Sequence, residues 1–412
     1  MNKIPNAPLR RASATSFRAR LRRFVLYALQ AVTAAFVPLL MPIRITHKLL
    51  LRGRPKRSIW TGTPIFTLTL SARSESMLGV NAKSLVTSTY SIARSFDYDL
   101  SSCRSWPIIG RLVPFVIFLW VCAFVDRVHA FCDRAILPQI ERSSFNSFEL
   151  LIYRLLRIEL FVYAYGGDVR SRETTRQLGE PNCCTECTLV GIACVCDEEL
   201  RRRNLVRLGT CARAIFAMGD MIEYTAGSRN DLFYWPVDLA ADGGRRYAPA
   251  YPAPEARNRV RIVHAPNHRM FKGTRFLETA VSDLAREGVP VELVLVEGIS
   301  NEQALMVYCT ADIIFDQCLI GFHGYFALES MALGKPVMCY IRKREYLLAP
   351  EECPIINVHP KTLRDDIRRV VANRGELGEL GRRGRRYVEK YYSLEALAGR
   401  LARAYADLEV SP

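Results

Sequence analysis

The sequence predicts an α/β protein with two domains, each built around a parallel sheet. Short apolar runs rich in β-branched residues alternate with amphipathic stretches of helix length, which is the pattern of strands and crossover helices. The clearest unit is residues 311–341, where a strand, a loop with two glycines, a helix and a second strand follow one another. Residues 241–258, rich in Ala, Pro and Gly, separate two halves that are each long enough for a domain.

Positive charge is concentrated before the first predicted strand. The 412 residues carry a net charge of +16, and thirteen basic residues but no acidic one precede Ser58. Residues 1–57 therefore carry a net charge of +13, and the rest of the chain carries only +3. A nucleic-acid-binding surface would place basic residues beside aromatic ones on the folded body, so this distribution argues against nucleic acid as a partner. It favours contact of residues 1–57 with an anionic membrane surface.

The basic arm encloses an apolar segment, Phe24–Ile43, which has twenty residues without a charge. It is long enough to cross a bilayer, but Gln30, Thr33, Pro38 and Pro42 interrupt it. Three interpretations stay open: a helix lying in the membrane interface, a single span, and a cleaved targeting segment. We expect a cytoplasmic protein that is peripherally associated with a membrane or anchored by one span.

Residues 58–240 are predicted to form the N-terminal domain. The expected elements are an apolar run at 60–70, helices at 71–85, 107–125 and 148–158, and strands at 126–131, 161–165 and 214–218. Residues 126–131 are expected to be the end of a strand that opens into a loop, where an α/β fold places its chemistry, and His129 lies in this segment. A structural histidine at a strand end explains the same residue equally well.

Five cysteines lie within fourteen residues of this half. Cys184, Cys187, Cys194 and Cys196 would supply four thiolates for a structural zinc ion, although their spacing is shorter than in most zinc sites. Packed reduced thiols and a disulfide cluster are the other two explanations.

Residues 259–392 are predicted to form the C-terminal domain. Lys272 and Gly273 stand just before a helix, where a cation and a permissive backbone can both meet a diphosphate. Gly324, Tyr325 and Phe326 open the helix of the 311–341 unit, whose N–H groups also favour an anion. Three helices are expected to follow, at 363–374, 377–392 and 394–408.

This half resembles the nucleotide-sugar-binding domain of retaining glycosyltransferases with the GT-B fold. Residues 328–337 match the second Glu of their Glu-x7-Glu signature, at Glu329, and the Ala-x-Gly-x-Pro-Val tail that follows it. The first Glu is absent, because Gly321 stands at its position. The resemblance implies two Rossmann-like domains with a cleft between them, and a last segment, residues 393–412, that packs back on the N-terminal domain.

The resemblance also implies roles in donor binding. In the family, an Arg and a Lys five residues apart hold the donor diphosphate. Lys272 matches the Lys, whereas Asn267 stands at the Arg position and Arg269 is the nearest cation that could replace it. Glu329 is expected to hold the ribose hydroxyls.

Catalytic roles follow from the same resemblance. A His in an Asp-x-Val-His segment faces the donor sugar in these enzymes, and His129 occupies the matching place. Asp316 and His323 are the candidates to replace the missing first Glu. The implied reaction is transfer of a sugar from a nucleotide-diphosphate sugar to a glycan or lipid-linked acceptor, with retention of configuration, without a required cofactor or metal ion, as in polysaccharide biosynthesis.

Two alternatives remain at this stage. The missing Glu is compatible with a catalytically silent relative that acts as a membrane-docked binding subunit. A sugar-nucleotide epimerase would share the fold and the donor but would need no membrane surface.

Overall fold

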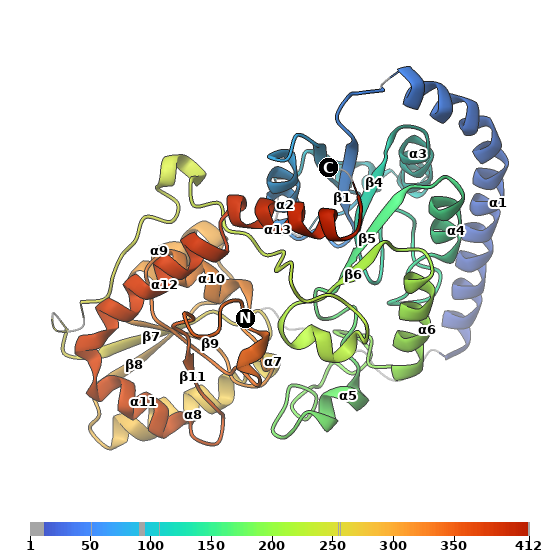
Figure 1. The fold of residues 1–412 in the computed structure, drawn as a ribbon. Coiled ribbons are helices and arrows are strands. Elements are labelled where there is room, and N and C mark those ends of the chain that lie inside the picture. The colour runs from blue at the N-terminus through green and yellow to red at the C-terminus, as the bar shows by residue number, and fades with distance from the viewer. Residues whose placement is uncertain are drawn as a thin grey trace.

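The computed structural model describes residues 12–50, 52–89, 95–106, 108–253, 255 and 257–410. Residues 1–11 and 51 of the predicted basic arm therefore lie outside the described part, as do residues 254 and 256 of the predicted linker and residues 411–412. Two lobes are visible, one built mainly from the first half of the chain and one from the second (Figure 1).

The N-terminal lobe contains a six-stranded sheet in the order β3-β2-β1-β4-β5-β6, with every neighbouring pair parallel. Its strands are β1 Arg57–Thr61, β2 Asn81–Val86, β3 Tyr98–Asp99, β4 Arg127–Phe131, β5 Glu159–Tyr163 and β6 Ala214–Phe216. Its helices are α1 Ala12–Leu50, α2 Thr67–Ser76, α3 Ile109–Phe124, α4 Ser147–Leu155, α5 Arg172–Gln177 and α6 Glu198–Gly209. This strand order is that of a Rossmann fold. From β1 the chain adds β2 and β3 on one side and β4 to β6 on the other, so the order of the strands reverses between β1 and β4.

The C-terminal lobe contains a five-stranded parallel sheet in the order β11-β10-β9-β7-β8. Its strands are β7 Val260–His264, β8 Val291–Leu295, β9 Ile313–Gln317, β10 Val337–Cys339 and β11 Ile356–Asn357. Its helices are α7 Arg269–Lys272, α8 Thr274–Arg286, α9 Asn301–Cys309, α10 Tyr325–Ala332, α11 Leu363–Ala372 and α12 Leu377–Tyr391. The order reverses between β7 and β9, so the carboxyl ends of these two strands form the expected binding edge. The predicted fold class, two Rossmann-like domains, is confirmed.

The last helix, α13 Leu394–Asp407, leaves the C-terminal lobe and packs on the N-terminal one (Figure 1). The Tyr405 hydroxyl donates to Glu75 of α2 at 2.8 Å, and the Arg400 guanidinium donates to the carbonyls of Leu232 and Phe233. The chain end therefore completes the core of the domain that the first half builds.

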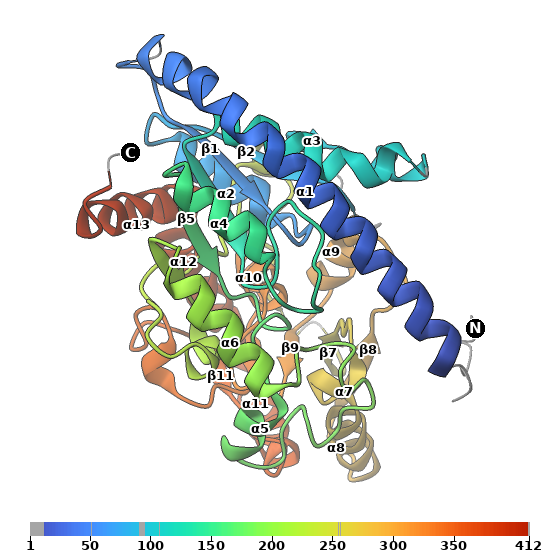
Figure 2. The same cartoon turned by 90° about the vertical axis from the view of Figure 1, so that its right-hand side faces the viewer.

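The long helix α1 lies across the N-terminal lobe, where it packs against α3 (Figure 2). Polar side chains fix this position: Gln30 donates to the Asn146 side chain, and buried Arg44 donates to the carbonyls of Cys122 and Val125. Residues Arg20–Leu50 are apolar and long enough to cross a membrane by length and composition, and within the described residues no other helix meets that test.

Two local predictions were wrong. The run at 60–70 divides into strand β1 and the start of helix α2, and the predicted helix at 71–85 contains strand β2. Gly79, with a φ of 82°, reverses the chain after α2, and the following residues pair with β1. The alternating Thr and Leu residues of α2 imitate a strand pattern, which tertiary contacts override.

Candidate functional site

The site lies where the strand order of the C-terminal sheet reverses. Lys272 ends α7, which follows β7, and its Nζ lies 2.6 Å from Oδ1 of Asp316 near the end of β9. The other oxygen of Asp316 accepts the Gly324 N–H at 2.6 Å. Burial by itself would raise the pKa of Asp316, but Lys272 and this N–H outweigh it and lower the pKa. Asp316 is therefore a fixed carboxylate that holds the lysine beside the start of α10.

Glycines lie at both loops of this edge. Gly273 has a φ of 75°, and a Cβ there would lie 2.4 Å from the Cys318 sulfur. A Cβ on Gly324 would lie 3.1 Å from the Lys272 Nζ. The absence of side chains therefore allows α7 to lie against β9 and lets the ammonium group approach the helix start.

Glu329 lies one turn into α10 and is 6% exposed. Its Oε1 accepts hydrogen bonds from the Tyr247 hydroxyl at 3.0 Å and, more weakly, from the Asn301 amide at 3.5 Å. Burial raises its pKa, which these donors only partly oppose. The carboxylate thus accepts from one hydroxyl and one amide in this structure.

Tyr247 belongs to the stretch predicted as a linker, residues 241–258, and this stretch adheres to the C-terminal domain. Its described part includes Tyr247, which is buried, and Ala250, whose N–H donates to the Leu333 carbonyl at 2.9 Å. The side chain of Tyr251 fills the space beside Gly334. The described part of the linker thus packs against α10 near Glu329 and against the residues that follow the helix.

The first two residues of α10 face neighbouring elements. The Tyr325 hydroxyl donates to the Pro236 carbonyl at 3.0 Å, and its ring meets Phe66 of the N-terminal domain edge to face at 4.6 Å. Phe326 packs on Tyr308 of α9 at 4.7 Å. The start of α10 is therefore also a contact between the two domains.

The position of the absent signature Glu is filled from another strand. A Cβ on Gly321 would lie 2.6 Å from a guanidinium nitrogen of Arg342, which follows β10. Arg342 donates to the Ile320 carbonyl at 2.8 Å and to the Glu223 carboxylate of the N-terminal domain at 2.5 Å. Both side chains are almost fully buried. A cation that bridges the two domains stands where the family has a carboxylate.

His323 lies in the same loop and is buried. Its ring stacks on Phe322, and its Nε2 lies 3.3 Å from the Tyr392 hydroxyl. Phe322 in turn presses on Gly219 of the N-terminal domain, where a Cβ would come within 2.2 Å of the ring. Burial lowers the pKa of His323 to about 4, so the imidazole is neutral at physiological pH.

Arg269 pairs with carboxylates other than Asp316. Its guanidinium pairs with Glu297 at 2.7 Å and with Glu278 at 3.1 Å, at an exposed position. The hydrogen bond to Glu297 contributes most to raising the Arg269 pKa. Its charge is therefore shared with two carboxylates.

The placement of His129 differs from the prediction. It is the central residue of β4, not a residue at its end, and it is fully buried. Its ring stacks on Trp60 at 3.9 Å, and its Nδ1 lies 2.8 Å from the Tyr163 hydroxyl. A cavity of about 10 Å³ beside it has room for roughly one water molecule. The expected strand end lies two residues later, at Phe131.

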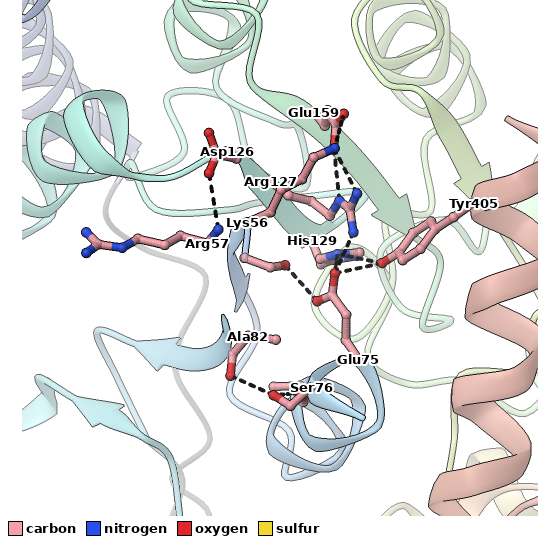
Figure 3. Close-up of polar contacts among 12 residues, drawn as sticks. Lys56, Arg57, Glu75, Ser76, Ala82, Asp126, Arg127, His129, Glu159 and Tyr405 are labelled. Carbon is pink, nitrogen blue, oxygen red and sulfur yellow. Dashed lines mark hydrogen bonds and ion pairs between the residues drawn. The ribbon is translucent and has the colours of Figure 1, made fainter. Parts of the chain in front are cut away.

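His129 belongs to a buried ion cluster around Glu75 of α2 (Figure 3). Glu75 accepts from Arg127 at 2.8 Å, and the other donors to it are Ser58, Trp60, Tyr405 and His129. Burial by itself would raise the Glu75 pKa, but His129 and Arg127 lower it. Burial lowers the pKa of His129.

The predicted zinc site is not formed. Across the described part of the chain, no group of three or more His, Cys, Asp or Glu side chains is arranged to hold a metal ion. The Cys187 and Cys196 sulfurs instead accept the N–H groups of Leu189 and Gly191. All thirteen cysteines are free, and this arrangement agrees with reduced thiols and not with a disulfide cluster.

No protein-family model matches the sequence, and no curated protein matches it either. Solved structures do match. Sucrose-phosphate synthase from Thermosynechococcus elongatus is 13% identical with a TM-score of 0.51, over 86% of this chain and 99% of its own. Anabaena HepE in complex with UDP and glucose is 11% identical with a TM-score of 0.53, over 86% of this chain and all of its own.

The chain has the GT-B fold. At these identities, the likeness extends to the fold and not to the residues of the site. The GT-B arrangement nevertheless explains why the carboxyl ends of both sheets contribute to one region between the domains.

Proposed function

We propose that the protein is a glycosyltransferase that moves a sugar from a nucleotide-diphosphate sugar to an acceptor, with retention and without a required metal ion. The observation that carries this proposal is the Lys272–Asp316–Gly324 arrangement at the start of α10. The complex of Anabaena HepE with UDP and glucose lends support, because it shows a protein of this fold with such ligands.

The chemistry of this arrangement suits a departing diphosphate. As the bond between the sugar and the diphosphate breaks, a bond to the acceptor oxygen would form and negative charge would grow on the leaving group. The acceptor hydroxyl would give its proton to the departing diphosphate. The Lys272 ammonium and the first N–H groups of α10, those of Tyr325 and Phe326, would stabilise that charge in a water-poor site. Asp316 would act through Lys272 by fixing its position, since both of its oxygens are engaged.

Glu329 would bind the ribose. Its carboxylate already accepts the Tyr247 hydroxyl, and a ribose hydroxyl would offer the same kind of donor. Donor binding would then displace Tyr247 and loosen the linker from α10. Arg269 would contribute less than Lys272, because two glutamates share its charge.

The acceptor would be associated with a membrane surface. Only 22% of the most apolar window of α1 is buried, whereas its polar residues Gln30 and Arg44 bond to the N-terminal domain. A helix fixed along the domain in this way fits a position in the membrane interface better than a span, because a span would carry the domain surface into hydrocarbon. We therefore propose a peripheral cytoplasmic protein that reaches a lipid-linked or glycan acceptor.

One observation favours a second function, nucleotide-sugar binding without transfer. Arg342 fills the place of the absent Glu and closes on Glu223 of the other domain. If this bridge persists when the donor binds, the donor sugar lacks the carboxylate contact that the first Glu of the signature makes in the resembled family.

Nucleotide binding to the full-length protein tests the proposal. A nucleoside diphosphate at 100 times its dissociation constant should raise the free energy of unfolding by about 2.7 kcal/mol. Thermal unfolding with UDP, GDP, ADP, CDP and dTDP would show whether one of them does so. The proposal fails if none of them shifts the transition.

A pair of variants tests the site. Lys272→Gln with Asp316→Asn removes both charges, which avoids leaving a buried carboxylate unpaired. We expect wild-type folding but affinity for the preferred diphosphate roughly tenfold or more lower, because a charged hydrogen bond is lost. Lys361→Gln, at an exposed position of the same domain, is the matched control and should bind normally.

A further inference from the structure

A pocket of about 620 Å³ opens on the N-terminal domain between α1, α3 and the carboxyl edge of the sheet. Gly62, which follows β1, and residues 134–139, which follow β4, form its floor. The strand order of this sheet reverses between β1 and β4, the place where α/β sheets bind ligands. We call it the α1–α3 pocket. Its volume lies within the range of small-molecule sites.

The walls of the α1–α3 pocket are mainly apolar. Leu26 and Leu29 of α1, Val113 of α3, and Ile136 and Leu137 after β4 contribute to them. Among the described residues that line the pocket, there is no Asp or Glu. Such a lining suits a hydrocarbon chain and not a free sugar.

Cationic side chains stand at the same pocket. Arg22 of α1 and Arg111 of α3 both line it, and neither side chain makes a hydrogen bond or ion pair with another described residue. The third arginine, Arg134, is paired with Asp133 at 2.9 Å. Two arginines without acidic partners beside an apolar cavity are complementary to an anionic group on an apolar chain.

The outer side of the same two helices is apolar and exposed. The exposed side chains of α1 include Phe24, Tyr27, Phe36, Leu39 and Ile43, and those of α3 include Ile109, Leu112, Val116 and Trp120. The pocket thus adjoins a surface suited to lipid, from which a chain can enter without crossing water.

The loop after β1 connects the pocket with the proposed donor site. Gly62 lies four residues before Phe66, whose ring contacts Tyr325 at the start of α10. One loop therefore joins the pocket floor to the helix that would hold the diphosphate.

We propose that the α1–α3 pocket binds a lipid phosphate. Arg22 and Arg111 hold its phosphate, and its hydrocarbon chain lies along α1 and α3. The role of this lipid as the acceptor rests on the proposed glycosyl transfer, whereas its binding does not.

Vesicle flotation of the full-length protein without nucleotide tests the binding. The vesicles are phosphatidylcholine alone, or phosphatidylcholine with equal mole fractions of farnesyl phosphate or farnesol, or with about twice that mole fraction of phosphatidylglycerol, which matches the charge of the phosphate monoester. We expect farnesyl phosphate to recruit roughly tenfold more protein than farnesol, which lacks the anion. Equal recruitment by farnesol, or by phosphatidylglycerol of equal charge, would overturn the proposal. Release by added inorganic phosphate would overturn it too, since the site would then be one for a free anion.

Two double variants separate the pocket from general charge attraction. Arg22→Gln with Arg111→Gln should reduce recruitment by farnesyl phosphate roughly tenfold, because both phosphate contacts are lost. Arg20→Gln with Arg23→Gln removes the same charge from neighbouring positions of α1 outside the pocket, and should have a much smaller effect. Equal losses in the two pairs would overturn the assignment. All four arginines are exposed, so both proteins should fold.

A third variant fills the cavity. Val113→Trp should weaken recruitment by farnesyl phosphate while Arg22 and Arg111 keep their charge, and unchanged recruitment would contradict the pocket. Lys272→Gln with Asp316→Asn should leave flotation unchanged. Flotation that passes while nucleotide binding fails would overturn only the proposed function, and the opposite pair of results would overturn only the lipid site.

Discussion

The two domains each bury a carboxylate beside a cation, but at different depths of their sheets. Glu75 and Arg127 meet on a face of the N-terminal sheet away from its carboxyl edge, where both side chains are fully buried (Figure 3). Asp316 and Lys272 meet at the carboxyl edge of the C-terminal sheet, and the Lys272 side chain is 13% exposed. We therefore expect the fully buried Glu75–Arg127 pair to stabilise the fold, and the partly exposed Asp316–Lys272 pair to contact a ligand.

The surroundings of the pairs reinforce this difference. All the donors around Glu75 come from protein side chains, and one of them, Tyr405, arrives from the far end of the chain. Around Lys272, glycines at 273 and 324 keep the backbone bare. A cluster closed by side chains on every side has no direction from which a substrate could enter.

The largest expected effect comes from breaking the deep pair. Arg127→Met leaves Glu75 buried without its guanidinium, which should lower the free energy of unfolding by about 3–5 kcal/mol. Chemical denaturation measures this loss. Glu159→Gln, at the partly exposed second partner of Arg127, should cost less than about 1 kcal/mol. Normal stability of Arg127→Met together with lost nucleotide binding would reverse the roles assigned to the two pairs.

Acid pH should affect the buried histidines of the C-terminal domain next. Burial lowers the pKa of both His264 and His323 to about 4. Between about pH 6.5 and pH 4 the unfolded chain therefore binds more protons than the folded one, so stability falls as the pH falls through this window. The loss should reach about 3 kcal/mol for each histidine at pH 4.

Denaturation curves of His323→Gln at several pH values would measure the share of this histidine. We expect a shallower decline of stability with acidity than in the wild type. The exposed His268→Gln is the control and should change the decline less. An unchanged slope in His323→Gln would mean that the pKa of His323 is the same in the folded and the unfolded protein.

The smallest of the three effects concerns the bridge between the domains. Gly321→Ala places a Cβ 2.6 Å from the Arg342 guanidinium at a φ of 102°, which should cost about 1–3 kcal/mol and displace the Arg342–Glu223 contact. Gly324→Ala has an ordinary φ and crowds only Lys272 and Asp316, so it should reduce nucleotide affinity more than stability. Calorimetric titration and denaturation of both variants would distinguish the two glycines. An equal loss of nucleotide affinity in the two variants would mean that Gly321 and Gly324 both lie at the nucleotide site.

The sequence was sufficient for the fold and for part of the site, for local reasons. The strand, glycine loop and helix of residues 311–341 can be recognised from thirty-one consecutive residues. Lys272–Gly273 and Glu329 each lie in a strand–loop–helix unit of this kind. The Glu223–Arg342 bridge and the Tyr247 hydroxyl could not be predicted, because each joins residues about 80 or more positions apart. Composition marked residues 241–258 as a linker, and only its aromatic residues hinted at a packed segment.

The placement of His129 shows a different limit. Strand boundaries are uncertain by a few residues, and an error of two residues moves a side chain from the end of a strand to its centre. The misassigned run at 60–85 has another origin, because Thr and Leu alternate at 67–70 as they would in a strand, whereas tertiary contacts make these residues the start of α2.

The contact between Tyr405 and Glu75 has a consequence for how the protein is made. Translation completes the N-terminal strands long before α13 leaves the ribosome. During synthesis the Glu75 carboxylate therefore lacks the Tyr405 donor, and the carbonyls of Leu232 and Phe233 lack the Arg400 donor. The first domain to be synthesised is thus the last to be finished. A gene cut at the domain boundary would yield two unfinished products, and co-expression of the halves would need α13 to find its place in trans.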